Sequence, residues 1–359
     1  MNDAPPGPIV PATLLEKPFQ VDGPAAFGAL ALELFHLHAR HNPVYGEYLR
    51  ALRIDIDAVQ REEQIPFLPI GLFRNKQVLL DGLEADLQFT SSGTTSLRPA
   101  AAGVGYGGVR QGYGSGPGAT TSTHHVPWPA LYERSFNTSF GAEYGRPSRW
   151  RILALLPAYL ERPGSSLVYM VEKLIAQTGD AKSGTWLHDL DGLSALLRQS
   201  EEEGVQTLLF GVPFALLDLA EKHPMLLPNT VIMETGGMKG RRPEMVREEL
   251  HGILKEAFGV PAIHSEYGMT ELLSQAWSQG NGAYRCPPWM KVLTRDVNDP
   301  FTRTQPGRTG GIDVIDLCNI ASCPFISTQD LGRVHPDGSF EVLGRFDHSD
   351  LRGCNLLVG

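Results

Sequence analysis

Residues 205–233 read VQTLLFGVPFALLDLAEKHPMLLPNTVIM. The segments 205–210 and 230–233 are short and apolar, which is typical of strands buried within a sheet. The segment 213–221 between them is predicted to be a helix. A strand, a helix and a second strand in this order predict a right-handed crossover that joins two parallel strands.

The same alternation extends to both sides of this stretch. Upstream we expect a strand at 151–156 and helices at 165–177 and 190–203, and downstream a helix at 242–258 and a strand at 260–264. This pattern predicts an α/β fold with a largely parallel sheet and helices on both faces. Ligands of such sheets bind beyond the carboxyl ends of the strands, so the loops after the strands are the places to search for a site.

The pattern changes toward both ends of the chain. From about residue 283, short strand-like runs at 291–293, 311–315 and 340–343 are separated by Gly, Pro and Asp, which predicts a small β-rich subdomain. Near the N-terminus, 25–40 has the spacing of an amphipathic helix.

Three histidines lie at the polar end of this helix: His36, His38 and His41. They could form a metal site, but partly cationic histidines also suit the negative end of a helix dipole, and we favour a solvated helix end. A second pair, His124 and His125, precedes a helix predicted at 129–140 and is expected to lie in a loop.

The composition excludes several classes of protein. The chain has 359 residues, with 31 Lys and Arg against 40 Asp and Glu, so its formal net charge is 31 − 40 = −9. This acidic balance argues against a basic nucleic-acid-binding domain. Four cysteines are too few for a disulfide scaffold, and no apolar stretch is long enough for a membrane-spanning helix. The first residues do not resemble a secretory signal, so we expect a cytoplasmic protein with no nucleic-acid partner and no membrane span.

The segment 100–119 contains eight glycines and almost no large apolar residues. Within it, GVGYGG at 103–108 matches the pattern G-x-G-x-x-G of dinucleotide-binding turns. That turn requires a strand before it and a helix after it, whereas Pro99 and alanines precede this segment and more glycines follow it. We therefore interpret 100–119 as a flexible insertion.

Two motifs carry groups that phosphate and metal sites use. FTSSGTTS at 89–96 surrounds Gly93 with hydroxyls, which can converge with backbone N–H groups on an anion, although a plain polar turn is the alternative. SEYGMTE at 265–271 follows a predicted strand. In it, Thr270 offers a hydroxyl to a phosphate and Glu271 a carboxylate to Mg²⁺. A carboxylate that opens the next helix would also be favoured by the helix dipole.

Two further motifs complete the set. METGGMKG at 233–240 follows another strand, and its paired glycines would let the backbone lie flat against a planar base, with a strand-to-helix turn as the alternative. STQDLGR at 327–333 contains Asp330, which is suited to accept hydrogen bonds from a ribose diol. GRFDHSDLRGC at 344–354 ends in Cys354, whose thiolate form the neighbouring Arg352 would favour.

Taken together and in this order, these motifs resemble those of the adenylate-forming (ANL) superfamily, which includes acyl-CoA synthetases, luciferases and peptide-synthetase adenylation domains. Within it, the chain looks most like the acyl-protein synthetase (LuxE-type) family. The resemblance extends from about residue 65 to the C-terminus, and its most specific segments are 155–166, 264–275, 286–291 and 344–354. It implies the N-terminal-domain fold of an adenylate-forming enzyme, α/β with parallel sheets, helices on both faces and a small β-rich subdomain.

The resemblance also implies a division of the chain. Residues 1–64 would form an N-terminal helical region, 65–343 an adenylation core that contains the insertion, and 344–359 a hinge-like tail in place of the full mobile C-terminal domain of longer relatives. Many relatives have one lysine after the phosphate loop and a catalytic lysine in the mobile domain, and neither has a counterpart here. The candidates for the missing positive charges are Arg98, Lys239 and Arg345.

Individual residues match positions of known role in the family. The nucleotide-binding positions are Ser91, Ser92, Gly93, Thr94 and Thr95 in the phosphate loop, and Gly236, Gly237, Tyr267 and Gly268 around adenine. Asp330 matches the ribose-binding aspartate, and Arg345 matches the arginine near the ribose and phosphate. Thr270 would contact phosphate, and Glu271 would bind Mg²⁺.

Relatives of this type activate a carboxylic acid as an acyl-adenylate and pass the acyl group to a cysteine near their own C-terminus, where Cys354 lies here. The resemblance therefore implies an ATP- and Mg²⁺-dependent acid–thiol ligase with a fatty acid substrate and an acyl-CoA reductase partner. The apolar residues at 155–159 and 210–214 could line a pocket for the acid or fill a core. The alternatives are an acyl-CoA ligase of the phenylacetate type and a catalytically degenerate nucleotide-binding protein.

The other three cysteines, Cys286, Cys318 and Cys323, could be zinc ligands. Their spacing is not that of a zinc knuckle and no fourth ligand is evident nearby, so we interpret them as structural residues. The sequence contains neither a G-x-S-x-G elbow nor a G-x-x-x-x-G-K-[ST] loop, which gives no support to a serine hydrolase or a P-loop NTPase.

Overall fold

The computed structural model describes residues 9–91, 121–157, 163–238, 241–243 and 245–345. Its largest sheet consists, in pairing order, of β5 (Gly184–Trp186), β4 (Arg151–Leu155), β6 (Thr207–Gly211), β7 (Thr230–Thr235), β8 (His264–Tyr267) and β9 (Ala276–Ser278). The pairings from β5 to β8 are parallel, and β9 pairs with β8 in the antiparallel direction. The prediction of a largely parallel sheet is therefore confirmed. Every residue of β4 and β6 is buried, as expected for strands covered on both faces.

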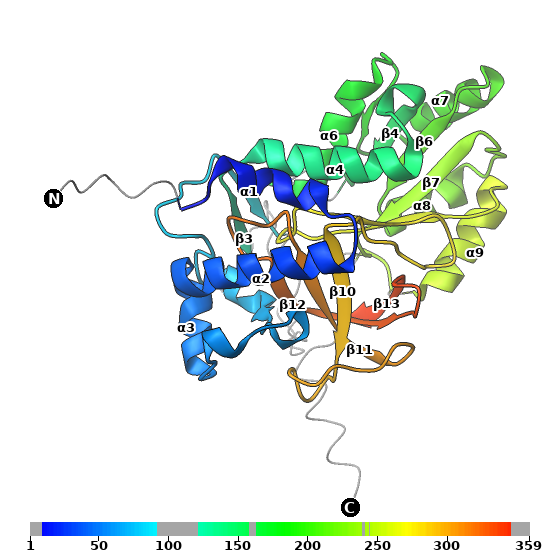
Figure 1. Cartoon of the computed structure of the whole chain (residues 1–359). Coiled ribbons are helices and arrows are strands. Elements are labelled where there is room, and N and C mark those ends of the chain that lie inside the picture. The colour runs from blue at the N-terminus through cyan, green and yellow to red at the C-terminus, as the bar shows by residue number, and fades with distance from the viewer. Residues whose placement is uncertain (1–8, 92–120, 158–162, 239–240, 244, 346–359) are drawn as a thin grey trace, which may run out of the picture.

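Helices cover both faces of this sheet (Figure 1). From β4, α6 (Ser166–Thr178) leads toward the β5 edge, and α4 (Pro129–Tyr144) packs against α6. The helices that lead toward the β9 edge are α7 (Leu190–Glu202), α8 (Pro213–Lys222) and α9 (Arg247–Phe258). Right-handed crossovers that run in opposite directions place their helices on opposite faces. Therefore α4 and α6 cover one face, and α7, α8 and α9 cover the other.

A second sheet forms the β-rich part that the sequence predicts after residue 283. It runs in the order β1 (Leu68–Pro69), β12 (Phe325–Val334), β11 (Thr309–Asp316) and β10 (Met290–Arg295), and β13 (Phe340–Arg345) also pairs with β12. The strands β10 to β13 pair in antiparallel fashion, whereas β1 is parallel to β12. The sequence did not predict β12, because its polar residues resemble a loop.

Two predicted boundaries are wrong. The last strand of the parallel sheet, β8, begins at His264 rather than at 260, because Pro261 cannot donate a ladder hydrogen bond and pairing to β7 starts at His264. Helix α9 begins at Arg247 rather than at 242, and Arg242 instead pairs with Asp218 and Glu221 of α8.

Two antiparallel strands flank the predicted glycine-rich insertion. They are β2 (Leu87–Thr90) and β3 (Thr123–Val126). Beyond them, the backbone N–H of Ser91 donates to the carbonyl of Ser122 at 3.0 Å. The pair His124 and His125 therefore lies in a strand, and the prediction of a loop is wrong. The predicted insertion 100–119 lies outside the described residues.

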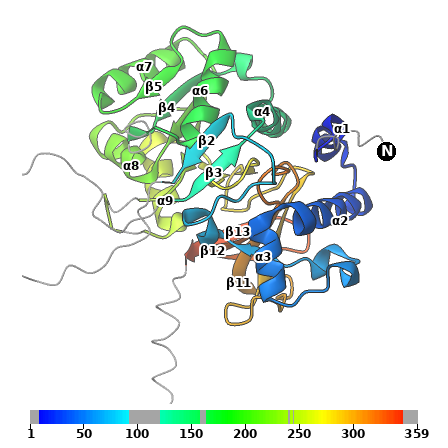
Figure 2. The ribbon, with the colours of Figure 1, turned by 90° about the vertical axis from the view of Figure 1, so that its left-hand side faces the viewer.

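Three helices lie near the N-terminus: α1 (Ala12–Glu16), α2 (Pro24–His41) and α3 (Pro43–Ala51). The helices α2 and α3 lie beside the second sheet, whereas α1 lies beside α4, where Glu16 pairs with Arg134 (Figures 1 and 2). The prediction of a solvated helix end is wrong for His38, which is fully buried in α2. Its Nε2 donates to the carbonyl of Ile320 at 3.0 Å, and its Nδ1 accepts from Asn42 at 3.2 Å. Burial lowers the pKa of His38 to about 3, so the ring is neutral and anchors the helix to the second sheet.

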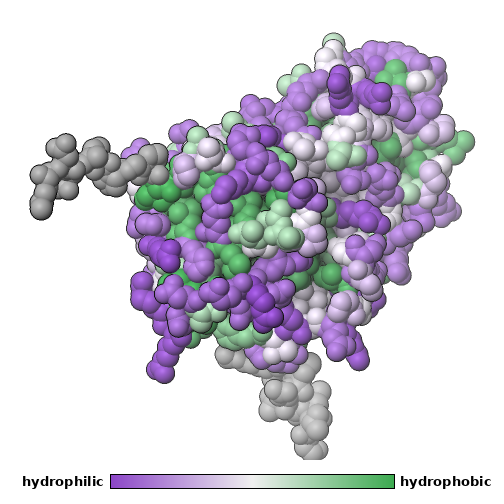
Figure 3. Space-filling view, viewed as in Figure 1, coloured by the Kyte–Doolittle hydropathy of each residue, from purple (hydrophilic) through white to green (hydrophobic). Residues whose placement is uncertain are grey.

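The described residues also contain short 3-10 segments: η1 (Lys17–Gln20), η2 (Ile56–Ala58), η3 (Glu62–Gln64), η4 (Ile70–Arg74) and η5 (Pro147–Arg149). Hydrophilic residues cover most of the face drawn in Figure 3, and its largest apolar area lies in the region between α1 and α2. Across the described residues, none of the helices is both long enough and apolar enough to span a membrane.

Candidate functional site

The carboxyl ends of β7 and β8 bring two of the predicted motifs together. The strands pair in register from Met233 with His264 to Thr235 with Glu266, so the loops that follow them leave the sheet side by side. Gly236 has a φ of 76°, a left-handed conformation that glycine adopts without strain. A Cβ at Gly237 would meet no atom of the described residues within 4 Å.

Three predicted site residues form a cluster beside these loops. The hydroxyl of Tyr267, at the end of β8, donates to Asp330 Oδ2 at 2.9 Å. Arg345 Nε lies 3.2 Å from Asp330 Oδ1, because Asp330 in β12 and Arg345 in β13 are register partners. The side chain of Asp330 is 12% exposed and that of Arg345 is 57% exposed. Asp330 is therefore the buried member of the cluster, and Arg345 faces solvent. Burial raises the pKa of Asp330, and the charge of Arg345 opposes that rise.

Glu271 lies close to this cluster. Its side chain is buried, and burial raises the pKa of its carboxyl, while a hydrogen bond from Ser122 and the charges of Arg345 and Arg74 oppose the rise. Arg345 is therefore within electrostatic reach of both Glu271 and Asp330. The expectation that Glu271 opens a helix is wrong, because the chain turns here and continues into β9.

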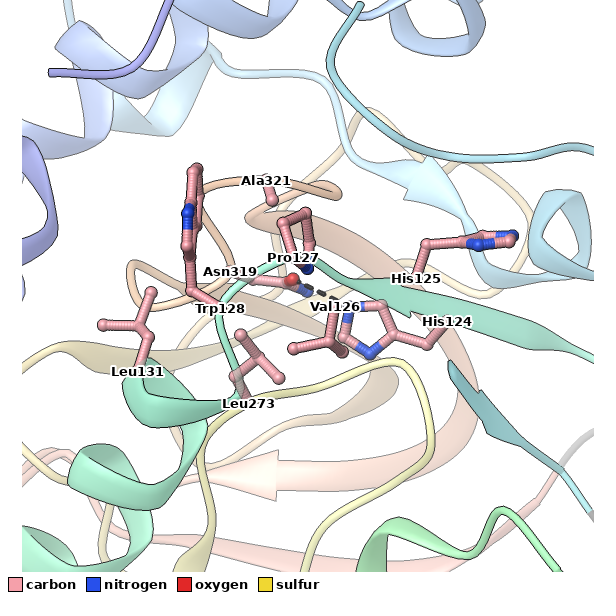
Figure 4. Close-up of a pocket in the computed structure, with 9 residues that line it drawn as sticks. All are labelled: His124, His125, Val126, Pro127, Trp128, Leu131, Leu273, Asn319 and Ala321. Carbon is pink, nitrogen blue, oxygen red and sulfur yellow. Dashed lines mark hydrogen bonds between the residues drawn. The ribbon is translucent and has the colours of Figure 1, made fainter. Parts of the chain in front are cut away.

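The loop that carries Thr270 and Glu271 is held by two side chains that the sequence did not identify. His124 Nδ1 lies 2.8 Å from the carbonyl of Thr270, and Asn319 Nδ2 donates to the carbonyl of Glu271 at 2.8 Å. His124 Nε2 and Asn319 Oδ1 lie 3.0 Å apart (Figure 4). Burial lowers the pKa of His124 to about 4, so the neutral ring, with a single N–H, donates to one of the two oxygens. These contacts hold the backbone of Thr270 and Glu271 in place.

The first residue of the predicted phosphate loop also lies here. The hydroxyl of Ser91 accepts a hydrogen bond from the backbone N–H of Ser122 at 2.9 Å, and the Ser122 side chain bonds to Glu271. The loop after β4 reaches the same place, because the carbonyl of Gly164 accepts from the N–H of Thr90 at 2.8 Å. The predicted site residues that lie outside the described part of the chain are Ser92, Gly93, Thr94, Thr95 and Cys354, with the candidate cations Arg98 and Lys239.

A cavity of about 300 Å³ lies at the same edge of the sheet, on the face covered by α7 and α8. Its apolar wall includes Leu155 and Pro157 after β4, and Phe214 at the start of α8. Asp218, Arg241 and Arg242 add charged groups to it. The sequence left open whether the stretches 155–159 and 210–214 line a pocket or fill a core. Residues of both stretches line this cavity.

Burial disfavours the thiolate form of the three described cysteines. Cys286, Cys318 and Cys323 are free, and burial raises the pKa of Cys286 and of Cys323 to about 12. Among the described residues, no group of three or more His, Cys, Asp or Glu side chains is arranged to hold a metal ion.

Glu266 is a second buried carboxylate at this edge, and its only signal in the sequence is its place in the motif 265–271. It accepts a hydrogen bond from the hydroxyl of Thr235 at 2.6 Å. Burial raises its pKa to about 7, and the neighbouring charge of Glu234 acts in the same direction. The carboxyl is therefore partly protonated at neutral pH.

We expect this burial to make stability depend on pH. Between about pH 4.5 and pH 7 the folded protein keeps a proton on Glu266 that the unfolded chain releases. The contribution of this proton to the free energy of unfolding is thus fully present below pH 4.5. It is lost as pH rises through 7, and the loss is about 3 kcal/mol. Glu266→Gln should remove this dependence, so urea titrations should show the variant gaining stability over the wild type by more at pH 8 than at pH 5.

Comparing the variant with the wild type at each pH separates Glu266 from other buried groups. His38 and His124 have lowered pKa values, so their contributions are lost as pH falls below about 6.5, in the opposite sense. Those contributions are the same in both proteins and cancel in the difference. An equal difference at the two pH values would contradict the prediction.

Comparisons with known proteins identify the fold. ATP-bound MatB from Rhodopseudomonas palustris matches 72% of this chain at 17% identity with a TM-score of 0.50, and this chain spans 47% of it, about half its length. A 2-hydroxyisobutyryl-CoA ligase in complex with 2-HIB-AMP matches 90% of this chain at 13% identity with a TM-score of 0.60, and 68% of that chain is covered. Its open conformation, in complex with 2-HIB-AMP and CoA, matches at 14% identity with a TM-score of 0.59 and covers 90% of this chain and 70% of that one.

No protein-family model matches the sequence, and no curated protein matches it significantly. The structural likeness shows that the chain has the α/β fold of adenylate-forming enzyme domains. This agrees with the fold expected from the motifs.

Proposed function

We propose that this chain is an ATP- and Mg²⁺-dependent ligase that activates a carboxylic acid as an acyl-adenylate and transfers the acyl group to the thiol of Cys354. One observation carries the proposal. Tyr267, Asp330 and Arg345 contact one another beside the loops that follow β7 and β8, with Glu271 within electrostatic reach of Arg345, in a chain whose fold is that of enzymes solved with ATP or an acyl-AMP.

Each residue of this cluster suits a part of the nucleotide. Asp330 would accept hydrogen bonds from the ribose diol, and the backbone of Gly236 and Gly237 would lie along adenine with Tyr267 and Gly268. Arg345, which is more than half exposed beside Asp330, would face the phosphates together with the hydroxyls of 91–95 and Thr270. These groups bind and orient the triphosphate for attack.

The surroundings of Glu271 fit a hard cation. Its carboxylate is buried with a raised pKa, which means that its neighbours leave its negative charge undercompensated. Bound Mg²⁺ would neutralise charge on the phosphate oxygens. His124 and Asn319 would hold the Glu271 backbone in place for this role.

The reaction has two steps. A carboxylate oxygen of the acid attacks the α-phosphorus, the bond to the β-phosphate oxygen breaks, and pyrophosphate leaves. The Cys354 thiolate then attacks the carbonyl carbon, and the bond to AMP breaks, which forms a thioester. By its family resemblance the acid would be a fatty acid, and a partner acyl-CoA reductase would receive the acyl group.

A second candidate function is transfer of the acyl group to free CoA. It is favoured by the likeness to the ligase solved with both 2-HIB-AMP and CoA. The two functions share the adenylation step and differ only in the thiol that accepts the acyl group.

Incubation with ATP, labelled acid and CoA distinguishes the two. We expect label on the protein that withstands denaturation, is released by hydroxylamine and is lost in Cys354→Ser, while ATP–pyrophosphate exchange persists. Cys286→Ser is the matched control and should keep the label. Label that appears only as soluble acyl-CoA would support the second function. A broad panel of acids that gives neither exchange nor hydroxamate would overturn both.

A further inference from the structure

Strand β13 contains one residue more than its pairing with β12 requires. Val342 is the register partner of Gly332, whereas the next pair along the two strands is Leu331 with Gly344. Leu343 therefore has no register partner in β12, and its side chain is 51% exposed. An extra residue of this kind is a β-bulge, and bulges are frequent next to functional sites, where they redirect a side chain.

This bulge decides which face of β13 carries Arg345. Side chains alternate along a strand, so in an unbroken strand Gly344 would lie on the same face as Val342 and would stand opposite Asp330. The extra residue shifts the register by one, and Arg345 takes that place instead. Its Nε then lies 3.2 Å from Asp330 Oδ1. Gly344 has a φ of 154°, which residues with a side chain rarely adopt, so glycine suits the bulge.

Arg247, the first residue of α9, bonds to the backbone of this bulge. Its Nη1 donates to the carbonyl of Val342 at 2.8 Å, and its Nε lies 3.1 Å from Glu234 Oε1. The planar guanidinium presents both donors in a fixed geometry, so one side chain binds the strand and the carboxylate together. Val342 directly precedes the unpaired Leu343, and the bond therefore holds β13 at the point where its register shifts.

Glu234 anchors Arg247 to the parallel sheet. Its side chain is 4% exposed, and His251 Nε2 lies 3.6 Å from the oxygen that Arg247 approaches. Burial alone would raise the pKa of Glu234, but the interaction with His251 and the positive charge of Arg247 outweigh it and lower the pKa, so the carboxylate is charged at neutral pH. The ion pair therefore ties the bulge of β13 to β7, the strand that leads to Gly236 and Gly237.

We propose that Arg247 is a positioning residue, which holds the bulge of β13 and thereby keeps Arg345 beside Asp330. The inference rests on the proposed function, in which Arg345 faces the phosphates, and it concerns how this cation is placed. The side chain of Arg345 is 57% exposed, and an exposed arginine loses much rotamer freedom when it is held in one direction. A fixed strand and the contact with Asp330 supply that direction before the nucleotide binds.

The NMR signal of Arg345 measures its placement directly. In protein whose arginines carry an NMR-active nitrogen isotope, the Nε–Hε signal of Arg345 is the one that Arg345→Ala removes. Because Arg345 Nε lies beside Asp330, this signal should be shifted from that of free arginine and should exchange slowly with solvent. Arg247→Met keeps an unbranched side chain but removes both bonds, so it should move the signal toward free arginine and speed the exchange.

Arg285→Met is the matched control. Arg285 Nη2 lies 3.3 Å from Asp337 Oδ2, in the turn before β13 and thus at the opposite end of the strand from Arg345. The substitution makes the same chemical change and should leave the Arg345 signal where it is. An Arg345 signal that is unchanged in Arg247→Met, or that moves equally in both variants, would overturn the proposal.

Exchange measurements separate positioning from general support of the fold. Arg247→Met should lower kcat/KM for ATP in ATP–pyrophosphate exchange about 10-fold, the range expected when a charged hydrogen bond is lost. In Arg345→Ala, which lacks the group to be positioned, the same substitution should change kcat/KM by less than about 2-fold. Deletion of Leu343, which removes the bulge, should lower kcat/KM as far as Arg345→Ala does. Arg285→Met should leave it unchanged.

The opposite outcomes are equally clear. An equal loss from Arg247→Met with and without Arg345 would overturn the proposal, because β13 would then need only general support. If urea titration shows that Arg247→Met is unfolded, Arg247→Lys replaces it, since lysine keeps the charge beside Glu234 but lacks the fork of donors. It should produce the same changes to a smaller extent, and their absence would count against the proposal in the same way.

Failure of the proposed function gives a different result. If no acid supports exchange, the NMR signal still decides the proposal, because it requires neither nucleotide nor acid. A signal that moves in Arg247→Met and stays in Arg285→Met would support the positioning of Arg345 in a protein that is not a ligase.

Discussion

Replacement of Glu271 by glutamine should lower the kcat/KM of ATP–pyrophosphate exchange about 100- to 1000-fold, the loss typical when a group that stabilises transition-state charge is removed. The carboxylate is buried, and its backbone is held by His124 and Asn319. Glutamine keeps the shape and the loop, but it removes the negative charge that would bind Mg²⁺. The loss should therefore be in the chemical step rather than in folding.

Magnesium dependence distinguishes this role from a structural one. In the wild type, chelation with EDTA should abolish exchange and added Mg²⁺ should restore it. In Glu271→Gln, the Mg²⁺ concentration for half-maximal exchange should rise, while the urea midpoint stays within the range of the control. Glu256→Gln, an exposed position on α9, is that control. An unchanged Mg²⁺ dependence in an active Glu271→Gln would contradict the assignment.

The parallel sheet could be predicted because its strands are buried on both faces. Runs such as 151–156 and 205–210 are then apolar without interruption, and the helices between them are long enough to be recognised. β12 escaped prediction because Thr328 and Asp330 are buried polar residues that hydrogen-bond within the second sheet and the site. A pattern of apolar residues cannot reveal a strand whose inward positions are polar.

Residues of the candidate site could be proposed from sequence where one motif supplies both the turn and the functional group. Glycine and carboxylate lie within a few residues of each other in 265–271, and the family order of motifs then links them to Asp330 and Arg345. His124 and Asn319 could not be found in this way, because they act from 146 and 48 residues away through the backbone carbonyls of Thr270 and Glu271. Contacts of this kind depend on how distant segments pack.

Replacement of Asp313 by asparagine should reduce the free energy of unfolding by about 3–5 kcal/mol. This is the loss expected when one partner of a buried ion pair is removed. Asp313 lies in β11 with its side chain 1% exposed, and Arg295 Nη1 approaches its Oδ1 to 2.7 Å. Arg303 pairs with the other carboxylate oxygen. The variant would leave two guanidinium groups, one of them in a side chain only 7% exposed, without their carboxylate.

The measurement is a urea titration at pH 7 with Asp22→Asn, an exposed position, as the matched control. An unchanged denaturant slope would show that the loss is one of stability rather than of compactness.

Arg295 also links the ion pair to the candidate site. It donates to the backbone carbonyl of Thr328, and the hydroxyl of Thr328 accepts from the N–H of Asp330. The ion pair therefore supports the strand that carries the ribose-binding candidate. We therefore expect the KM for ATP to rise in Asp313→Asn at temperatures where the variant is folded. A loss below about 1 kcal/mol would mean that the arginines behave as surface charges, and the link from Asp313 to Asp330 would then have to be abandoned.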